Sequence, residues 1–584
     1  MLVYSPVSEG ALKSSLGKPE YSYLFVLRRF LPVLEQIGEV QVVEHAADLS
    51  GIVQRHTEAG RTDLVFLSFA PPNRTPDPPS CPSISVFAWE FDTLPNEEWG
   101  GNWREDWTAV LRRFNAAITL STHSREVTQR AMGPQFPVFA IPAPIFDRFR
   151  VPEHDRGKRP PTEPRLLPFT GIVMDSREFE VTEQGLTHTR PMERFCERDW
   201  QGEWIHLAFG SEDENRGRLV GFYMSEAWGA WSQLQQPWVL LPVAVVGRVT
   251  LTLRAAGYAS NADRDIRVVI GDCERTLRLT EHFQRHRVTF DVTEPANTIV
   301  FRGLTVEQKP DSPDVRSMGI GLCYIEVDRP APAPIRSLRR VHRKVRGDRR
   351  QLATTSSTSR VDAASDLALD GVVYTSVLNP NDGRKRWDDI VSAFGWAFKD
   401  NPEATLLLKM THHSLASYLR TFQFTLYRLG PIKCRIVAIQ GYMSETELAE
   451  LVELSTYYVN ASEAEGLCMP AMEFLSAGVP AVAPDHTAMA DYIGPDCAFV
   501  LDHSLIPALW PHDERGLWRS TKNTVHWDSL VEQFHASFAV ATQDPDRYQR
   551  MSQAAVSRQR AFCADDVVRA DLLNVWEPAD RAVM

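Results

Sequence analysis

Two carboxylates separated by seven residues, Glu465 and Glu473, mark the part of the sequence best suited to chemistry. They lie in the stretch 457–484 (YYVNASEAEGLCMPAMEFLSAGVPAVAP), whose pattern predicts a strand, a tight loop, a helix and a second strand. Glu465 falls in the loop, and Glu473 falls about one turn into the helix. We therefore expect both carboxylates at the carboxyl end of a strand, where open α/β sheets bind ligands.

The expected helix also offers a site for an anion. Pro470 suits the first turn of this helix, because an N–H group there makes no hydrogen bond within the helix and proline lacks only that group. Gly478 suits a left-handed cap at the end of the helix. The backbone N–H groups at the helix entrance would point toward a bound diphosphate, and they belong to Leu467, Cys468 and Met469. The spacing alone also fits an ordinary α/β crossover with surface acids, and that alternative stays open.

This stretch resembles the donor-site signature of retaining family 4 glycosyltransferases. The similarity consists of the spacing of the two acids, of Gly466 after the first of them, and of the later A-G-x-P-x-x-A run. The usual family sequence is E-G-F-G, whereas this chain has Cys468 in place of the second Gly. The resemblance implies that Glu465 contacts the transferred sugar and that Glu473 accepts hydrogen bonds from the ribose hydroxyls. It also implies that Gly466, Leu467 and Cys468 bind the donor.

A basic loop follows the first strand expected in the C-terminal part. This loop, NPNDGRKR, contains Arg384 and Lys385, which match the basic pair that the same family uses there. Breaking a sugar–phosphate bond leaves negative charge on the departing diphosphate, and fixed cations can stabilise that charge. The resemblance implies this role for the pair, and Lys409, which ends a later strand at the same sheet edge, is a further candidate. A solvated turn is the alternative for the basic pair.

The loop has no D-x-D motif near it that would hold a divalent ion. We therefore expect no metal and no cofactor, and a nucleotide-diphosphate sugar as the substrate. Compensation of the leaving-group charge is expected from the protein itself.

The N-terminal part, residues 1–165, alternates strand-like and helix-like segments and predicts a doubly wound acceptor domain. Gly10, in the small-residue loop after the first strand, is a candidate donor-binding residue. The segment 115–143 resembles the end of the acceptor domain in the same glycosyltransferases. That domain normally carries a His near the donor sugar, but the matching loop AWEFD has acids instead. Glu90 and Asp92 are therefore candidates to accept the acceptor's proton, and packing and solvation are the alternative for Glu90.

The pattern changes in residues 170–328, where short strands follow one another with little helical periodicity between them. Turn residues recur at the spacing of a sandwich, which predicts an inserted all-β domain. Trp228 and Trp231 lie beside Glu226 in this region. Exposed tryptophans in a sandwich can stack on sugar faces, which would make the domain a carbohydrate-binding module. Core packing of the same tryptophans is the alternative.

Residues 329–366 form a Pro-rich and basic linker. Within it, the stretch 335–350 (IRSLRRVHRKVRGDRR) spaces apolar residues among arginines in a near-helical pattern. A basic amphipathic helix of this kind can lie on an anionic membrane. A solvated charged linker is the alternative.

Residues 367–584 again alternate strands with helices and predict a second doubly wound domain, which binds the nucleotide sugar. Ser444 and Glu447 form a capping-box pattern, and the tail 527–576 is mostly helical with a break near Pro545. Two doubly wound domains that face each other across a cleft are the GT-B architecture, which the chain resembles everywhere except in the insertion. In that superfamily the helical tail crosses back to brace the first domain.

Composition limits the other classes of function. The 584-residue chain has a formal net charge of −12, so no basic field favours nucleic acid. Its eight cysteines form no C-x-x-C pair or metal-like cluster, and they fit a reducing compartment. Neither a signal peptide nor an apolar run long enough for a bilayer is evident. We expect a cytoplasmic protein, with the basic linker as its route to the inner face of the membrane.

These observations predict a retaining hexosyltransferase that moves a sugar from a nucleotide-diphosphate sugar to a glycan or lipid-linked glycan, in surface polysaccharide biosynthesis. A sugar synthase of the same fold that acts on a soluble acceptor is the second interpretation. A non-catalytic carbohydrate-binding scaffold is the third, and the intact acids and basic pair argue against it. Hydrolysis of nucleotide sugars by the purified protein separates the enzyme interpretations from the scaffold.

Overall fold

The computed structural model describes most of the chain. The described residues are 1–7, 21–61, 63–149, 164–169, 172–182, 185–188, 198–210, 218–223, 225–309, 314, 316–329, 367–412, 416–441, 443–511 and 513–575. Gly10 and the basic stretch 335–350 lie outside these residues, so what the sequence predicts for them stays a prediction.

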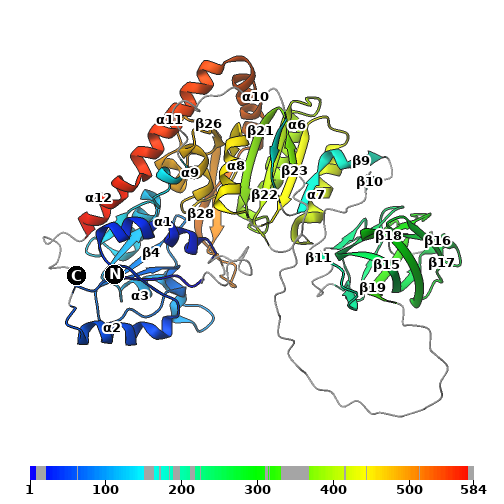
Figure 1. Ribbon diagram of the computed structural model, residues 1–584, viewed down its shortest axis with the longest axis horizontal. Coiled ribbons are helices and arrows are strands. Elements are labelled where there is room, and N and C mark those ends of the chain that lie inside the picture. Colours follow the sequence, from blue (N-terminus) through cyan, green and yellow to red (C-terminus); the bar gives the residue numbers. More distant parts are fainter. Residues whose placement is uncertain are drawn as a thin grey trace, which may run out of the picture. The chain divides into compact units, whose positions relative to one another are not determined.

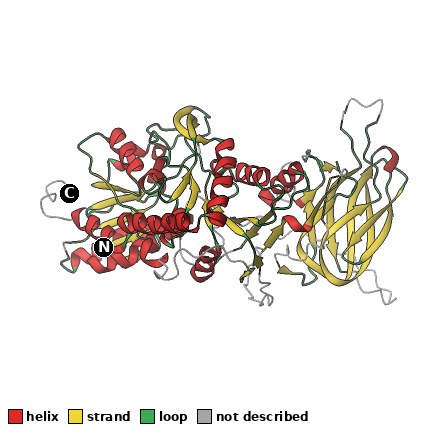
Figure 2. Cartoon of the chain, turned by 90° about the horizontal axis from the view of Figure 1, so that it is seen from above, coloured by secondary structure: helices red, strands yellow, loops and turns green. Residues whose placement is uncertain are grey.

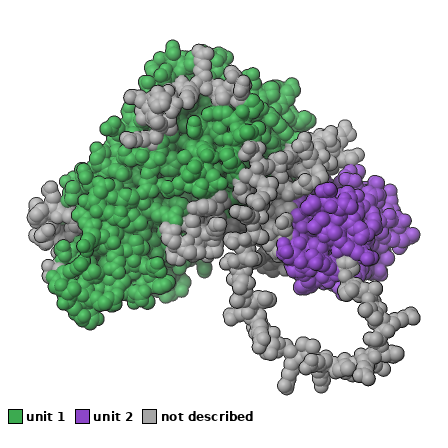
Figure 3. Space-filling view, viewed as in Figure 1, with its two compact units in different colours: residues 1–177, 366–584 green, residues 178–365 purple. Residues whose placement is uncertain are grey.

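The chain forms two compact units (Figure 3). Unit 1 comprises residues 1–177 and 366–584, and unit 2 comprises residues 178–365. The expected start of the insertion at residue 170 is corrected by β8 (Ile172–Asp175), which pairs antiparallel with β23 (Arg435–Gln440) in a sheet of unit 1. The chain therefore enters this sheet before it leaves for unit 2.

The N-terminal sheet of unit 1 is parallel throughout, with the strand order β2-β1-β3-β4-β5-β6. Its central strands β1, β3, β4 and β5 are largely buried, as expected for a sheet covered on both faces, whereas the edge strands β2 and β6 are partly exposed. The strands are β1 (Leu2–Tyr4), β2 (Gln41–Val43), β3 (Phe66–Phe69), β4 (Ser83–Phe87), β5 (Ala116–Thr119) and β6 (Val138–Ala140). The helices are α1 (Tyr21–Ile37), α2 (Leu49–Glu58), α3 (Trp107–Leu111), α4 (Thr122–Met132) and α5 (Phe146–Phe149).

The C-terminal sheet has the order β26-β25-β24-β21-β22-β23-β8, and only β8 runs antiparallel. The chain winds outward from β21 to β23, returns to place β24 beside β21, and winds outward again to β26 (Figure 1). The strand order therefore reverses between β21 and β24. The further strands are β21 (Val372–Leu378), β22 (Ala404–Met410), β24 (Tyr457–Val459), β25 (Ala481–Ala483) and β26 (Ala498–Val500). The helices between them are α6 (Trp387–Ala397), α7 (Ala416–Leu429), α8 (Glu445–Leu454) and α9 (Met469–Ser476).

The two sheets confirm a mixed α/β class with parallel strands, and several local predictions hold within it. The capping box of α8 is complete, because Ser444 accepts from the N–H group of Glu447 and the Glu447 carboxylate accepts from the N–H group of Ser444. Pro470 lies in the first turn of α9, and Gly478 has the left-handed φ of 80° expected after its end. Pro32 lies inside the continuous helix α1.

The helical tail returns to the N-terminal sheet. It consists of α10 (Trp527–Gln543), α11 (Pro545–Cys563) and α12 (Asp565–Val575), with the expected break before Pro545. Figure 1 shows α12 beside α1, and the N–H group of Asp565 donates to the Asp147 carboxylate over 2.9 Å. Val568 and Leu572 share one hydrophobic cluster with α1 residues such as Phe30. This contact confirms the expectation for the tail.

Two small antiparallel pairs complete unit 1. β7 (Arg165–Leu167) pairs with β20 (Leu367–Leu369). The hairpin formed by β27 (His503–Leu509) and β28 (Trp518–Val525) was not foreseen in the sequence. Its Ser520 hydroxyl accepts from the N–H group of Thr93 over 2.9 Å, so the hairpin fastens the segment after β4.

Strands predominate in unit 2 (Figure 2). Its main sheet is built around two long strands that pair antiparallel with register shifts, and it encloses a hydrophobic cluster of its own. The long strands are β15 (Trp238–Gly257) and β18 (Gln284–Arg302). The other strands of the main sheet are β11 (Arg198–Asp199), β12 (Ile205–Ala208), β13 (Leu219–Val220), β14 (Ala230–Trp231), β16 (Asp265–Ile270), β17 (Cys273–Arg278) and β19 (Ile320–Asp328). β9 (Phe179–Thr182) and β10 (Gly185–His188) form a separate antiparallel pair.

Candidate active site

The loop after β24, residues 460–468, is buried along its whole length. The backbone of Glu465 is held on both sides, because its N–H group donates to the Thr487 hydroxyl over 3.0 Å and its carbonyl accepts from the N–H group of Ala488 over 3.1 Å. Thr487 has a left-handed φ of 51°, which is unusual for a β-branched residue. The loop after β25 thus fixes the position of Glu465.

Cys468 occupies the position of the second Gly in the E-G-F-G signature that this loop resembles. It has a left-handed φ of 63° and immediately precedes α9. A glycine adopts this conformation without strain, whereas a side chain makes it costly, by roughly 1–2 kcal/mol. The loop therefore follows a path that suits glycine although the residue is a cysteine. The Cys468 thiol is buried, accepts from Asn460 Nδ2 at 3.3 Å and has its pKa raised to about 12 by burial.

Gly466 is the point at which this loop meets the N-terminal sheet. A Cβ atom at Gly466 would lie 2.9 Å from the Cβ of Ala88 and 3.1 Å from the nitrogen of Trp89. These two residues follow β4 directly. The absence of a side chain at Gly466 therefore lets the segment with Glu90 approach the loop with Glu465.

Arg384 and Lys385 converge on Glu465, as the sequence predicts. Lys385 Nζ lies 2.6 Å from Glu465 Oε1, and Arg384 Nη1 lies 3.5 Å from Glu465 Oε2. The basic loop follows β21 and the acidic loop follows β24, the two strands between which the strand order reverses. Such a switch point is where open α/β sheets bind ligands.

Burial would raise the pKa of Glu465, but Lys385 and Arg384 outweigh it and lower the pKa to about 2. Glu465 is only 3% exposed, so its charge is stabilised by the two cations rather than by water. The carboxylate is ionised at any physiological pH.

Glu90 reaches the same cluster from the N-terminal part. Its Oε1 lies 3.3 Å from Arg384 Nη2, while Arg384 Nε lies 3.0 Å from Asp382 and Nη1 donates to the Ala464 carbonyl over 2.5 Å. Burial raises the pKa of Glu90, and Arg384 opposes that shift. Arg384 thus joins three carboxylates and one carbonyl into a rigid arrangement.

Glu473 lies in a different ion-pair network. Its Oε1 accepts from Arg29 Nη2 over 3.2 Å, and Arg29 Nη1 bonds to Glu445 at 2.9 Å. Burial raises the pKa of Glu473 to about 7, although Arg29 acts in the opposite direction. The role at the ribose that the resemblance implies therefore requires the nucleotide to share or replace the contact with Arg29.

Lys409 lies near the end of β22, the neighbour of β21, and is buried. Its Nζ lies 3.3 Å from the Thr411 hydroxyl, and no ion pair of Lys409 occurs within the described part of the chain. Burial lowers its pKa to about 8. A buried ammonium group of this kind is available to an anionic ligand.

Asp92 does not reach the cluster. Its carboxylate forms an ion pair with Arg130 over 2.9 Å, and its side chain is 48% exposed. Of these two acids, Glu90 contacts Arg384, and the role of Asp92 beside the acceptor stays a prediction.

Two histidines in this region were missed from the sequence. His486, in the loop after β25, is buried, and His123 lies in the first turn of α4. The Nε2 atom of each is buried and has no hydrogen-bond partner among the described residues. Burial, followed by the neighbouring His503, lowers the pKa of His486 to about 3, and burial lowers that of His123. The available signal was the T-H-S sequence after β5, in the segment that already resembled an acceptor domain.

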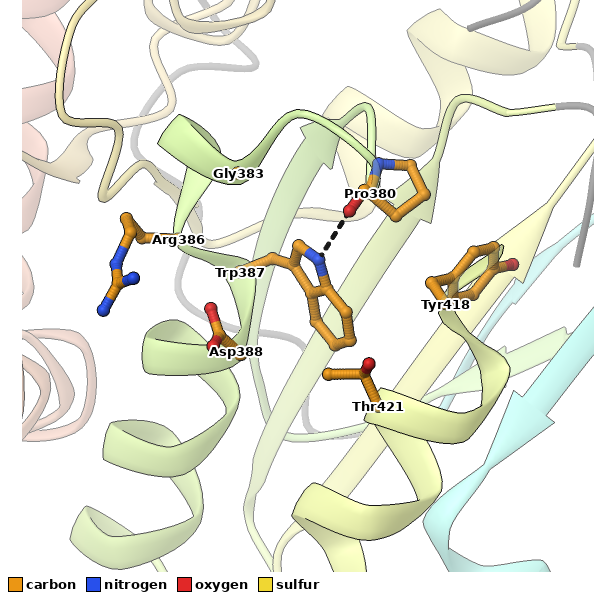
Figure 4. Close-up of a pocket in the computed structure, with 7 residues that line it drawn as sticks. All are labelled: Pro380, Gly383, Arg386, Trp387, Asp388, Tyr418 and Thr421. Atoms are coloured by element: carbon orange, nitrogen blue, oxygen red, sulfur yellow. Dashed lines mark hydrogen bonds between the residues drawn. The ribbon is translucent and has the colours of Figure 1, made fainter. Parts of the chain in front are cut away.

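A cavity of about 220 Å³ lies beside the basic loop (Figure 4). The Trp387 indole donates to the Pro380 carbonyl over 3.0 Å and lies between Pro380 and Thr421, while Arg386 points away from Tyr418. The residues that line the cavity are Pro380, Gly383, Arg386, Trp387, Asp388, Tyr418 and Thr421. The cavity includes neither Arg384 nor Lys385, so it borders the charged cluster without containing it.

A search of the described residues gives no group of three or more His, Cys, Asp or Glu side chains placed to hold a metal ion. Among the described helices, none is both long and apolar enough to cross a membrane.

Comparisons with known proteins add distant similarities. Residues 197–329 match a family described as a domain of unknown function (DUF7024). A comparison with curated proteins finds no match. A glycosyltransferase structure from Rickettsia africae ESF-5 is similar at 11% identity and a TM-score of 0.28, over 36% of this chain and 48% of that one.

Two further structures are similar in the same way. A sucrose-phosphate synthase from Thermosynechococcus elongatus aligns at 17% identity and a TM-score of 0.27, over 36% of this chain and 46% of that one. This chain therefore spans about half the length of these first two structures. Anabaena Alr3699/HepE in complex with UDP aligns at 8% identity and a TM-score of 0.41, over 98% of both chains.

Proposed function

We propose that this protein is a retaining, metal-independent glycosyltransferase of GT-B architecture. It would move a sugar from a nucleotide-diphosphate sugar to a glycan or lipid-linked glycan, in surface polysaccharide biosynthesis on the cytoplasmic side of the membrane. The observation that carries this proposal is the meeting of Glu465 with Arg384 and Lys385 at the switch point between β21 and β24.

The cations of this cluster suit a diphosphate leaving group. Arg384 and Lys385 are already desolvated and held by carboxylates, so little reorganisation is needed when negative charge develops beside them. A phosphate oxygen can replace part of the carboxylate contacts, since guanidinium and ammonium groups bind both kinds of anion. Lys409 would supply a third cation near the same strand ends.

The acids would then position the two sugars. Glu465 would accept from hydroxyls of the transferred sugar, and Glu473 would accept from the ribose once the nucleotide shares its contact with Arg29. Glu90, on the N-terminal side of the cluster, is the candidate closest to the acceptor. His123 and His486 offer neutral imidazoles with unused Nε2 atoms for further hydroxyl contacts.

Retention of configuration requires attack from the face that the leaving group departs from. In this mechanism the bond between the anomeric carbon and the phosphate oxygen breaks as the acceptor oxygen bonds to the same carbon. The acceptor's proton passes to the departing diphosphate, so no covalent intermediate on Glu465 is needed. The role of the protein is to hold both substrates and to stabilise the diphosphate charge.

The test begins with a thermal-shift panel of UDP-, GDP- and dTDP-sugars, because a bound donor stabilises the folded state by mass action. We expect one nucleotide class to raise Tm and the purified protein to hydrolyse or transfer that sugar. Glu465→Gln should lower turnover at least about tenfold, equivalent to about 1.4 kcal/mol of transition-state stabilisation. The proposal would be contradicted if none of the nucleotide sugars raised Tm, or if the Glu465→Gln variant transferred sugar at the wild-type rate.

A further inference from the structure

Unit 2 carries aromatic side chains along the outward face of β19. β12 and β14 both pair with β19, β12 opposite residues 324–327 and β14 opposite residues 321–322. β15 pairs with β19 over the same stretch, so β12 and β14 follow one another along its other edge. The outward-facing residues of these short strands therefore form one continuous strip beside β19, here called the aromatic strip.

At one end of the strip, three rings follow one another, the first two of them stacked. Trp204 lies one residue before β12 and is 60% exposed, with its ring 5.5 Å from that of His206 at an interplanar angle of 23°. The His206 ring lies 5.2 Å from that of Tyr324 on β19. Ile205 and Leu207, which alternate with these residues on β12, are buried in the core of unit 2. The alternation turns the rings toward solvent rather than into the core.

At the other end, three further rings gather over a glycine. Trp231 pairs with Gly321, and a Cβ atom at Gly321 would lie 2.9 Å from Trp231 Cζ3 and 2.7 Å from Phe283 Cζ. The Trp228 ring lies 4.6 Å from that of Phe283 and 5.3 Å from that of Trp231. All three side chains are half-buried and lie outside the core cluster of unit 2, which favours a surface role over core packing for the two tryptophans.

Charged groups border this second cluster at fixed positions. The Trp228 indole donates to Glu226 Oε2 over 2.8 Å, and Arg316 Nη2 lies 2.9 Å from Glu226 Oε1. Arg316 also pairs with Asp314 at 2.6 Å and lies over the Tyr223 ring at 5.3 Å. The side chains of Glu226 and Arg316 are 38% and 32% exposed, so both remain within reach of a ligand.

The first cluster has an equivalent pair. Glu326, opposite His206 on β19, lies 2.6 Å from Arg285 on β18. Each carboxylate of the strip therefore has an arginine partner, and the strip presents hydrogen-bonding groups without a large excess of either charge.

These properties specify the chemistry of a ligand. The Trp204 ring is exposed and the three rings of the second cluster are half-buried, so the strip leaves aromatic surface in contact with water, and such patches mark interaction sites. The carbon-bound hydrogens of a pyranose ring pack against such faces, and its hydroxyls both donate to carboxylates and accept from arginines. Because each carboxylate is paired with an arginine, the strip offers no net field that would attract a strongly charged partner of either sign. The surface complements a neutral chain of sugars.

We propose that the aromatic strip of unit 2 binds a neutral polysaccharide, with sugar rings stacked on Trp204 at one end and on Trp228 at the other. This site is distinct from the cluster around Glu465, and its ligand is held without chemistry. It gives the protein a means of retaining a glycan chain independently of the transfer reaction.

The test is affinity electrophoresis of the full-length protein in native gels that contain dextran, hydroxyethylcellulose, galactomannan or xylan. We expect slower migration in at least one of these gels. Trp204→Ala and Trp228→Ala should each weaken the apparent affinity at least about tenfold, as expected for the loss of one stacked ring. Trp518→Ala is the matched control, since Trp518 is 74% exposed and lies in unit 1. Thermal unfolding of each variant shows whether it is folded.

Normal migration in all four gels would overturn the proposal, as would retardation that both variants retain. If the Trp518→Ala control lost as much retardation as the two variants, the retardation would reflect non-specific adsorption, and this result would also overturn the proposal. If Trp204→Ala instead abolishes self-association in sedimentation velocity without changing migration, the strip is a protein interface. None of these readouts involves sugar transfer, so their failure is distinguishable from failure of the proposed function.

Discussion

Arg29 on α1 donates to Glu473 on α9 over 3.2 Å, and both side chains are buried. The two residues lie 444 positions apart in the chain. This contact ties the first helix of the N-terminal sheet to the helix that follows the Glu465 loop. Binding of a nucleotide at Glu473 would therefore act directly on a contact between the two parallel sheets.

We predict that Glu473 makes the stability of the protein depend on pH. Its folded pKa, about 7, lies above its ordinary value because of burial. The folded state thus keeps this proton to a higher pH than the unfolded chain, and stability falls as pH rises from about 4.5 to about 7, by at most about 1.4 kcal/mol per unit. Glu473→Gln should remove this slope in urea unfolding measured across that range.

The control for this experiment is Glu445→Gln, because Glu445 bonds to the same arginine but is 61% exposed. It should leave most of the slope in place, because burial is the main cause of the raised pKa of Glu473 and Glu445 adds only a smaller part. Equal slopes in the wild type and Glu473→Gln would show that Glu473 is ionised at all these pH values and that Arg29 outweighs burial.

We predict that transfer survives excess EDTA and depends on Lys385. A departing nucleotide diphosphate needs compensation by an ion or by fixed groups, and Lys385 is positioned 2.6 Å from Glu465 to supply it. Lys385→Gln keeps a hydrogen-bond donor but loses the charge, a contact worth about 1.5–3 kcal/mol. We expect turnover to fall more than about tenfold. Strict dependence on Mg²⁺ or Mn²⁺ would contradict the mechanism.

Arg386→Gln is the matched control on the same loop. Its guanidinium pairs with Asp389 at 2.6 Å and does not contact Glu465 within the described structure. Arg384 is less suitable for this comparison, because its removal leaves the largely buried Glu90 without its ion-pair partner and threatens the fold.

Lys409 should make nucleotide affinity fall at alkaline pH. Burial lowers its pKa to about 8, and a bound diphosphate would raise that pKa by stabilising the ammonium form. The contribution of Lys409 to binding is therefore complete below pH 8 and is lost as pH rises through the pKa of the complex. Calorimetric titrations at pH 7, 8 and 9 with the nucleotide found in the thermal-shift panel measure this loss. Lys409→Met should abolish the dependence, while the exposed Lys433→Met should retain it.

Gly466→Ala should destabilise the protein although alanine adds only one methyl group. The new Cβ would approach the Cβ of Ala88 to 2.9 Å and the nitrogen of Trp89 to 3.1 Å, and neither backbone segment can move without disturbing the cluster. We expect a loss of about 1–3 kcal/mol, typical of overpacking. Gly51→Ala on α2 meets only the tip of Arg55 at 3.6 Å and should leave Tm unchanged or slightly higher. An unchanged Tm for Gly466→Ala would show that the two segments are not in contact.

The sequence predicted those parts of the site that depend on local pattern. Strand ends in a parallel sheet meet at one edge, and this rule together with the resemblance to family 4 glycosyltransferases placed Glu465, Arg384 and Lys385 in one site. Arg29 could not be predicted as a site residue, because its contact with Glu473 depends on how the two sheets pack, and local periodicity does not indicate that packing. His486 was missed for a similar reason, since burial makes it relevant and burial is a tertiary property.

The start of unit 2 is a second feature that the sequence pattern could not place. The short apolar strand Ile172–Asp175 lies within residues 170–328, which the sequence assigned to the insertion as a whole. Its partner is β23, where Asp175 and Arg435 form a buried ion pair at 2.7 Å. Only this contact over 260 residues assigns the strand to unit 1.

The boundary at residue 178 should decide how well unit 1 folds when unit 2 is removed. Replacement of residues 178–365 by a short flexible linker should leave a folded unit 1 that binds nucleotide, because Arg177 and Asp370 lie close enough for an ion pair at 3.3 Å. A deletion that begins at residue 170 instead removes β8 and leaves Arg435 buried without Asp175. Breaking a buried pair in this way costs about 3–5 kcal/mol. Thermal unfolding and nucleotide titration of both deletions should therefore give a stable, binding-competent protein in the first case and a much less stable one in the second. If both deletions aggregate, unit 2 is needed for the folding of unit 1, and if both are equally stable, β8 contributes nothing to the sheet that it joins.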